Sequence, residues 1–93
     1  MTHVNGKEKG TIKLYALSTC IWCMRTKRLL NSLGVACDYV DVDLLGDDDR
    51  EQAMQEIEKF NPSGSFPTMI INNDLCIVGY KEDKIKNVFD KGR

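Results

Sequence analysis

The 93-residue chain has no long apolar run, no signal-peptide pattern and almost no net charge. Apolar runs such as residues 69–71 are far shorter than the ~18 residues that cross a bilayer, and residues 1–10 lack an apolar centre. Thirteen Lys and Arg against fourteen Asp and Glu give a net charge of −1, without the basic excess that binds phosphate backbones. We therefore expect a cytoplasmic protein that binds neither membranes nor nucleic acids.

Only 2 residues are proline and 7 are glycine, while 42% are hydrophobic and 29% charged, which excludes disordered and collagen-like chains. A chain of this size forms one compact core at most and buries roughly two-thirds of its unfolded surface. Residues 1–10 are polar and include Gly6 and Gly10. We expect a flexible N-terminal arm over residues 1–10 and one domain over residues 11–93.

Hydrophobic periodicity divides the rest of the chain into strands and helices. Apolar alternation or β-branched content predicts strands at residues 11–17, 35–42, 67–71 and 75–78. Apolar residues three and four positions apart predict helices at residues 20–33, at 47–60 and from about 85 to Gly92. Asp48 and Glu51 have capping-box spacing at the second helix, and residues 72–74 predict a hairpin turn.

The order β-α-β-α-β-β-α predicts an α/β fold, in which three helices flank a four-stranded mixed sheet. Four cysteines are present; Cys37 and Cys76 stand alone, on the two strands that would form the edges of this sheet. Those edges are three strand spacings, or about 14 Å, apart, whereas a disulfide needs less than ~7 Å. We expect both cysteines to be packed free thiols.

The other two cysteines, Cys20 and Cys23, form a C-x-x-C where a strand leads into a helix. Unpaired N–H groups and the helix dipole favour a thiolate at the first position, and C-x-x-C motifs lower the pKa of the first thiol to ~3.5–7.5. Cys23 lies one turn deeper, close enough for a reversible disulfide. We expect Cys20 to be the nucleophile and Cys23 the resolving thiol; the second C-x-x-C of a typical zinc site is missing, so no metal is expected.

Four motifs occur in a recognisable order along the chain. They are Leu14-Tyr15, Cys20-Ile21-Trp22-Cys23, Phe66-Pro67-Thr68 and Val78-Gly79-Tyr80. Together they resemble the glutaredoxin family of the thioredoxin fold over about residues 11–89. The resemblance implies a thiol–disulfide oxidoreductase with a redox-active centre, acting in electron transport and cell redox homeostasis.

The resemblance also implies a substrate groove beside the dithiol. Pro67 would be a cis-proline that brings the backbone of Phe66 beside the sulfurs, although a proline that simply starts a strand is an alternative. Trp22 would shield the sulfurs or contact a partner, or else pack on the helix surface. The residues implied to contact a substrate are Trp22, Phe66, Pro67, Thr68, Gly79 and Tyr80.

Two positions depart from the glutathione-binding members of the family. Leu17 replaces a Lys or Arg that holds a glutathione carboxylate, and Val78 stands where a Gly-Gly pair is usual. A charge-assisted contact is worth about 1.5–3 kcal/mol, so its loss weakens glutathione binding roughly 10–100-fold. In these positions the chain is similar to the NrdH-type redoxins, which accept electrons from thioredoxin reductase.

These observations predict a monomeric hydrogen donor with no tightly bound cofactor. Its reductant would be a thioredoxin-reductase-type flavoenzyme or glutathione as a co-substrate. Its target would be a small-molecule disulfide or a disulfide-containing protein such as ribonucleotide reductase. The alternative is an iron–sulfur protein, in which Cys20 and Cys23 from two chains supply thiolates to a cluster in a dimer.

Alkylation should distinguish the two active-site thiols. Cys20 should react with iodoacetamide first, and its rate should level off below the unperturbed thiol value of ~8.5, because only Cys20 occupies the unsatisfied end of the helix. Cys20→Ser should abolish exchange, whereas Cys23→Ser should attack a disulfide and accumulate the mixed disulfide. Peptide mapping that finds Cys23 modified first would contradict this assignment.

Overall fold

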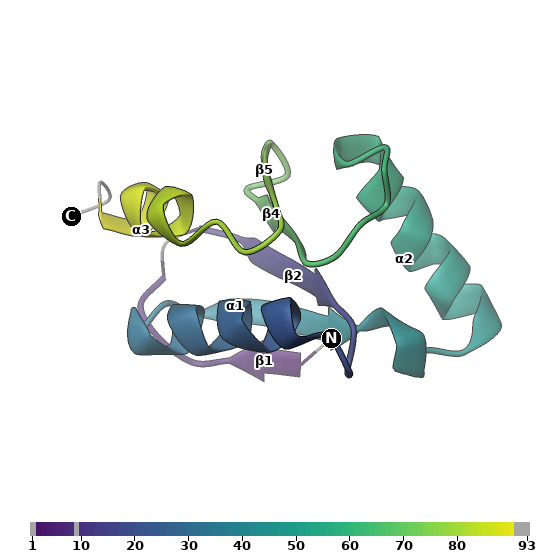
Figure 1. The fold of residues 1–93 in the computed structure, drawn as a ribbon, viewed down its shortest axis with the longest axis horizontal. Helices are drawn as coiled ribbons and strands as arrows, with labels where there is room; N and C mark the ends of the chain where they lie inside the picture. Colours follow the sequence, from purple (N-terminus) through teal and green to yellow (C-terminus); the bar gives the residue numbers. More distant parts are fainter. Residues whose placement is uncertain (1, 9, 91–93) are drawn as a thin grey trace.

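The computed structural model describes residues 2–8 and 10–90, which form one sheet with helices packed against it (Figure 1). The strands are β1 (Thr2–Val4), β2 (Ile12–Ala16), β3 (Cys37–Asp41), β4 (Thr68–Ile71) and β5 (Leu75–Val78). The helices are α1 (Ile21–Ser32), α2 (Asp47–Phe60) and α3 (Glu82–Asp90), and a 3₁₀ turn, η1 (Val42–Leu44), precedes α2. None of these helices is long and apolar enough to cross a membrane. The predicted helix end near Gly92 lies outside the described residues.

The sheet has five strands, one more than the sequence predicts. Their order is β1-β3-β2-β4-β5; β2 and β3 are parallel, and the other neighbours are antiparallel. The predicted α/β class and mixed sheet are therefore confirmed. The prediction that β3 forms an edge is wrong, because β1 pairs with it, with Thr2 opposite Tyr39 and Val4 opposite Cys37.

The additional strand comes from the segment for which we predicted a flexible arm. After β1, the N–H of Lys7 donates to the Gly34 carbonyl at 2.7 Å, and the Lys7 carbonyl accepts from the Ala36 N–H at 2.9 Å. Gly6 lies so close to this backbone that an added Cβ would fall 2.7 Å from the Gly34 oxygen. This strand has no signal in the sequence, because it is largely exposed and has no apolar alternation.

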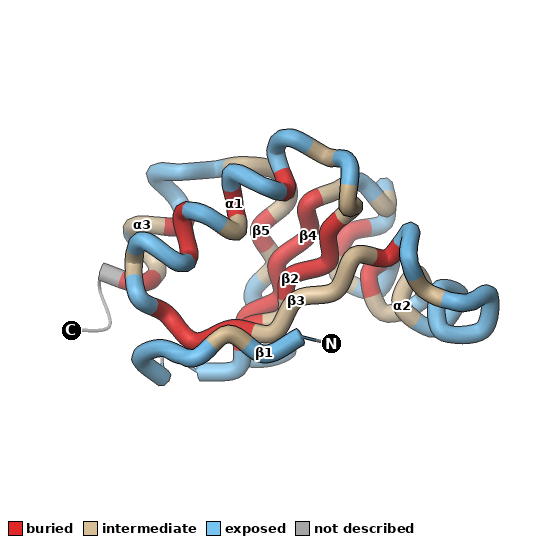
Figure 2. Tube along the Cα trace, turned by 90° about the horizontal axis from the view of Figure 1, so that it is seen from below, coloured by how far each residue is buried: buried red, intermediate tan, exposed pale blue. Residues whose placement is uncertain are grey.

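Alternate residues of the central strands point into two hydrophobic layers. Leu14 of β2 and Met69 of β4 face α1 and α3, where Ile85 is fully buried. Tyr15 faces the opposite layer, which Ile57 of α2 covers. Figure 2 shows buried segments along the central strands β2 and β4. The sheet is therefore held between α1 and α3 on one face and α2 on the other, which fixes where the loops at the end of β2 emerge.

The start of α2 differs from its prediction in one respect. Gly46 is the N-cap residue, and no side chain caps the helix, so the predicted capping box of Asp48 and Glu51 does not form. Three aspartates occupy the first turn, where the positive end of the helix dipole favours negative charge.

A polar contact ties α2 to the central strand. Tyr15 Oη at 2.7 Å and Lys13 Nζ at 3.2 Å both donate to Glu56 Oε1. Burial alone would raise the pKa of Glu56, but these hydrogen bonds outweigh burial and lower the pKa. The charged form of Glu56 is thus favoured at this helix–strand contact.

Substitution of Gly6 tests whether the N-terminal segment belongs to the folded unit. Gly6→Ala should lower the free energy of unfolding by about 1–3 kcal/mol, because the new methyl group meets backbone atoms of residues 34–36 that cannot move aside. Urea unfolding measures this change. Gly46→Ser is the control, since its Cβ meets open space. Equal stability of Gly6→Ala and the parent chain would show that this segment contributes nothing to the fold.

Candidate functional site

Cys20 caps the N-terminus of α1. Its backbone is extended, and its Sγ accepts a hydrogen bond from the Cys23 N–H at 3.2 Å. The Cys20 thiol is partly exposed. It is not in a disulfide, and neither are the other three cysteines of the chain. The Cys20 sulfur therefore lies at an open helix N-terminus that points a backbone donor at it, as predicted from the motif.

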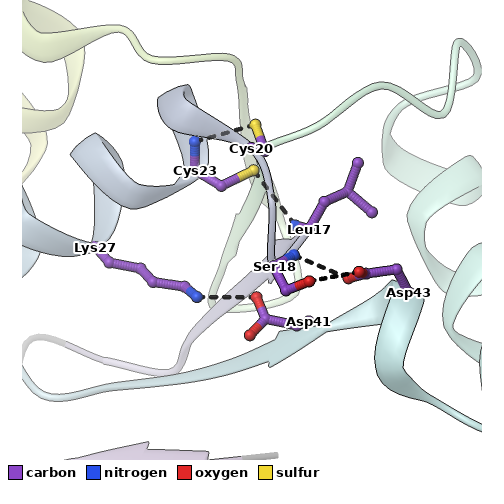
Figure 3. Close-up of polar contacts among 7 residues, drawn as sticks. All are labelled: Leu17, Ser18, Cys20, Cys23, Lys27, Asp41 and Asp43. Atoms are coloured by element: carbon purple, nitrogen blue, oxygen red, sulfur yellow. Dashed lines mark hydrogen bonds and ion pairs between the residues drawn. The ribbon is translucent and has the colours of Figure 1, made fainter.

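Cys23 occupies the same helical turn but a different environment (Figure 3). Its side chain is fully buried, and its Sγ accepts a hydrogen bond from the Leu17 N–H at 3.4 Å. Burial raises the pKa of Cys23 to about 12, and the hydrogen bond to Cys20 adds to the rise; the Leu17 N–H and the charge of Lys27 oppose it. At neutral pH Cys23 is therefore a protonated thiol behind the more exposed Cys20.

Two carboxylates outside the motif hold the loop and the helix in place. Asp43 of η1 accepts hydrogen bonds from the Ser18 N–H at 2.8 Å and the Ser18 hydroxyl at 2.5 Å, and these contacts lower the pKa of Asp43. Asp41 at the end of β3 pairs with Lys27 Nζ at 2.8 Å. Sequence reasoning missed both, because the partners lie 25 and 14 residues apart and no local pattern connects them.

Five of the six predicted substrate-contact residues line one cavity of about 240 Å³: Trp22, Phe66, Pro67, Gly79 and Tyr80. The Phe66-Pro67 peptide bond is cis, as the resemblance implied. Trp22 is 51% exposed; its ring stacks on Tyr80 at 6.0 Å, and Arg25 lies over it at 5.0 Å. Because Trp22 lies between Cys20 and Cys23 in the chain, this cavity adjoins the C-x-x-C segment.

Thr68, the sixth predicted contact residue, does not line this cavity. Its side chain is fully buried, and its hydroxyl donates to the Ser65 carbonyl at 2.6 Å and accepts from Asn61 Nδ2 at 3.1 Å. These partners belong to the loop that leads to Pro67, so Thr68 supports the groove from within and its side chain does not line it.

Asn61 organises this loop and was not identified from the sequence, where it formed part of a helix-breaking cluster. The side chain is 5% exposed; besides Thr68, its Nδ2 donates to the Ser65 carbonyl at 3.2 Å, and its Oδ1 accepts from the Ser63 hydroxyl at 2.7 Å. A buried amide with these bonds fixes the path of residues 61–66.

The position expected to carry a cation in glutathione-binding relatives is beside the dithiol. Leu17 donates its N–H to Cys23, and its side chain packs with Phe66 against the core on the α2 side. The backbone of Leu17 therefore contacts Cys23, while its side chain points away from the sulfurs (Figure 3). Leu17 brings no charge to the site.

Cys37 and Cys76 are separated in the sheet by β2 and β4. Both thiols are free, as predicted, and burial raises the pKa of each. Within residues 2–8 and 10–90, no three side chains of His, Cys, Asp or Glu are grouped to hold a metal ion.

Comparisons with known proteins agree with this geometry. A family model described as Glutaredoxin matches residues 12–76. The glutaredoxin of Methanosarcina mazei Go1 is 51% identical over 92% of this chain and 84% of its own, with a TM-score of 0.89. Methanoredoxin of Methanosarcina acetivorans is 48% identical over 89% and 87%, with a TM-score of 0.88. NrdH-redoxin of Escherichia coli, a glutaredoxin-like protein with a thioredoxin-like activity profile, is 25% identical over 83% and 92%, with a TM-score of 0.63. The predicted thioredoxin-like fold is confirmed.

Removal of the Asn61 amide should loosen the groove. Asn61→Ala should lower the free energy of unfolding by about 1–3 kcal/mol, since Thr68 and Ser63 lose buried hydrogen-bond partners. Disulfide reduction should also slow, because the loop that positions Pro67 is no longer held. Thermal unfolding and a disulfide-reduction assay measure the two effects. Asn87→Ala, at an exposed asparagine of α3, is the control; equal losses in both variants would contradict this function of Asn61.

Proposed function

The chain belongs to the glutaredoxin family of thiol–disulfide oxidoreductases, and on that basis we propose that its Cys20-Ile21-Trp22-Cys23 segment reduces disulfides as a dithiol hydrogen donor. One observation carries the proposal. Within one helical turn, Cys20 is partly exposed at an open N-cap and Cys23 is fully buried behind it. An attacking thiol and a resolving thiol need this difference in access.

The reaction has two exchange steps. The Cys20 thiolate attacks one sulfur of the target disulfide and bonds to it, while the other target sulfur leaves as a thiolate and takes a proton from water. Cys23 then loses its proton and attacks Cys20 Sγ; the Cys20–Cys23 bond forms and the bond to the target breaks. Two electrons pass from the dithiol to the target, and a reductant later returns them.

The groove beside the dithiol would bind the target. Trp22 and Tyr80 offer a stacked aromatic surface, and the backbone at Phe66 and Pro67 offers an edge to an extended segment. Arg25, which lies over Trp22, adds positive charge at the rim. Thr68 is left out of the contact surface, because its hydroxyl is already bonded within the protein.

A thioredoxin-reductase-type flavoenzyme is the reductant we favour over glutathione. Leu17 beside Cys23 offers no charge to a glutathione carboxylate, and Val78 replaces the usual glycine. A flavoenzyme would dock on the groove surface and would not depend on a carboxylate contact. In this proposal the protein works as a monomer in the cytoplasm and has no tightly bound cofactor. Its targets are small-molecule disulfides or a disulfide-containing protein such as ribonucleotide reductase.

The iron–sulfur alternative makes a different observable prediction. One chain supplies at most Cys20 and Cys23 at this site, so a cluster with four cysteine ligands would need two chains. Anaerobically purified protein that is brown and dimeric would favour the cluster, and colourless, reducible monomer would favour the oxidoreductase.

The choice of reductant can be tested directly. Disulfide reduction should be faster with NADPH and thioredoxin reductase than with glutathione and its reductase. Leu17→Lys should raise the glutathione-dependent rate by roughly 10-fold, as expected for a restored charge-assisted contact. Leu17→Met is the matched control, because it lengthens the side chain without adding charge, and it should leave the rate unchanged.

Strong wild-type turnover with glutathione that Leu17→Lys does not change would contradict the choice of reductant. In that outcome Arg25 or Lys81, which both lie near the groove, would be the cations that hold the carboxylates.

A further inference from the structure

The burial of Cys23 makes the second exchange step difficult, because this thiol must lose its proton before it can attack. Cys23 must become a thiolate to attack Cys20 Sγ, because the thiolate is the nucleophilic form. Burial raises the pKa of Cys23 to about 12, so very little of Cys23 is a thiolate at neutral pH. Once Cys20 is bonded to a target, its hydrogen bond and negative charge no longer oppose ionisation, but the burial remains. A nearby positive charge would lower the remaining free-energy cost of ionising the buried Cys23 thiol.

Lys27 is placed to supply that charge. It follows Cys23 by four residues on α1, so the two side chains share one face of the helix. Figure 3 shows both side chains extending from α1 toward the ends of β2 and β3. There Cys23 Sγ meets the Leu17 N–H at 3.4 Å, and Lys27 Nζ meets Asp41 Oδ1 at 2.8 Å.

Asp41 and Tyr39 restrict where the ammonium can go. Asp41 lies directly opposite Ala16 in the β2–β3 register, one residue before Leu17. The ammonium also lies 4.4 Å from the centre of the Tyr39 ring. The exposed fractions are 27% for Lys27 and 18% for Asp41, so solvent screens the charge less than at a typical surface site. A lysine held in this way keeps its ammonium on the β3 side of α1 instead of sampling solvent, and its charge there lowers the pKa of Cys23.

The other ionisable groups around Cys23 do not supply a second cation. The core that surrounds Cys23 is otherwise apolar on β2, β4, β5 and α3, through residues such as Leu14, Met69, Ile77 and Ile85. The titratable and charged side chains near it are Cys20 and Lys27 on α1, Cys37, Tyr39 and Asp41 on β3, Asp43 on η1, and Tyr80. Within residues 2–8 and 10–90, Lys27 is the one cation of this set.

We propose that Lys27, held by Asp41, is a positioning residue for the second exchange step, in which its ammonium stabilises the Cys23 thiolate as it forms. The inference rests on the proposed function. The proton of Cys23 passes to water, and the target sulfur leaves as a thiolate that takes a proton from water. Lys27 keeps its own proton throughout and forms no bond.

The test separates the two exchange steps in the reduced, full-length chain. One equivalent of dithiobis(nitrobenzoate) reacts first with Cys20 and releases one coloured thiolate; attack by Cys23 then releases the second. The second phase should be absent in Cys23→Ser. Stopped-flow absorbance at a series of pH values gives the rate of each phase and the pH midpoint of the second.

Lys27→Met should slow the second phase about 10-fold at neutral pH and move its midpoint upward by about one pH unit, because loss of a nearby opposite charge disfavours the thiolate. The first phase should change less than about twofold, and a cooperative thermal unfolding transition like that of the parent chain should show that the variant is folded. Lys27→Arg, which keeps the charge, should restore the second phase. Arg28→Met removes a cation from the next position on α1 and should leave both phases unchanged.

The outcomes distinguish this inference from the function on which it rests. If Lys27→Met has the wild-type second phase and midpoint, or if Arg28→Met slows that phase equally, Lys27 does not position the resolving step. If the wild-type chain releases no second thiolate, or if Cys23→Ser releases it at the same rate, the dithiol function itself is wrong.

Discussion

The junction between β2 and α1 is the constraint on which the rest of the site depends. β2 is the central strand, held by β3 on one side and β4 on the other, and it ends at Ala16. The next N–H, that of Leu17, reaches Cys23 Sγ, and the Cys23 N–H reaches Cys20 Sγ. A strand that is paired on both sides thus holds the first turn of α1 in place. The positions of the two thiols follow from these contacts.

The difference between the two thiols follows from burial at that junction. A single helical turn carries both, yet one lies at an open helix end and the other faces the layer of core between the sheet and α1. The same burial that protects Cys23 from unwanted attack makes its ionisation costly. Lys27 on α1, held by Asp41 on β3, places its ammonium at this side of the helix, where its charge lowers the pKa of Cys23.

The groove is assembled from three segments that are distant in the sequence. The first turn of α1 contributes Trp22, the loop before β4 contributes Phe66 and Pro67, and the turn after β5 contributes Tyr80. The Gly79 N–H donates to the Pro67 carbonyl at 2.8 Å, which joins two of these segments. Gly79 adopts a φ of 81°, a conformation that favours glycine, and the turn there directs Tyr80 toward Trp22. Long-range packing and local turn geometry are both needed to close the groove.

Local sequence determined much of this protein: the C-x-x-C at a helix start, the span of α2 from residue 47 to 60, and the hairpin whose Asn72 and Asn73 adopt positive φ. These features depend on residues that are near one another in the chain, so periodicity and turn chemistry reveal them. Tertiary structure alone decided the pairing of β1 with β3, the Asn61 amide network and the contact of Lys27 with Asp41. In each case the partners carry no local signal, because an exposed edge strand lacks apolar alternation and a polar side chain acquires its partner only when the sheet brings distant segments together.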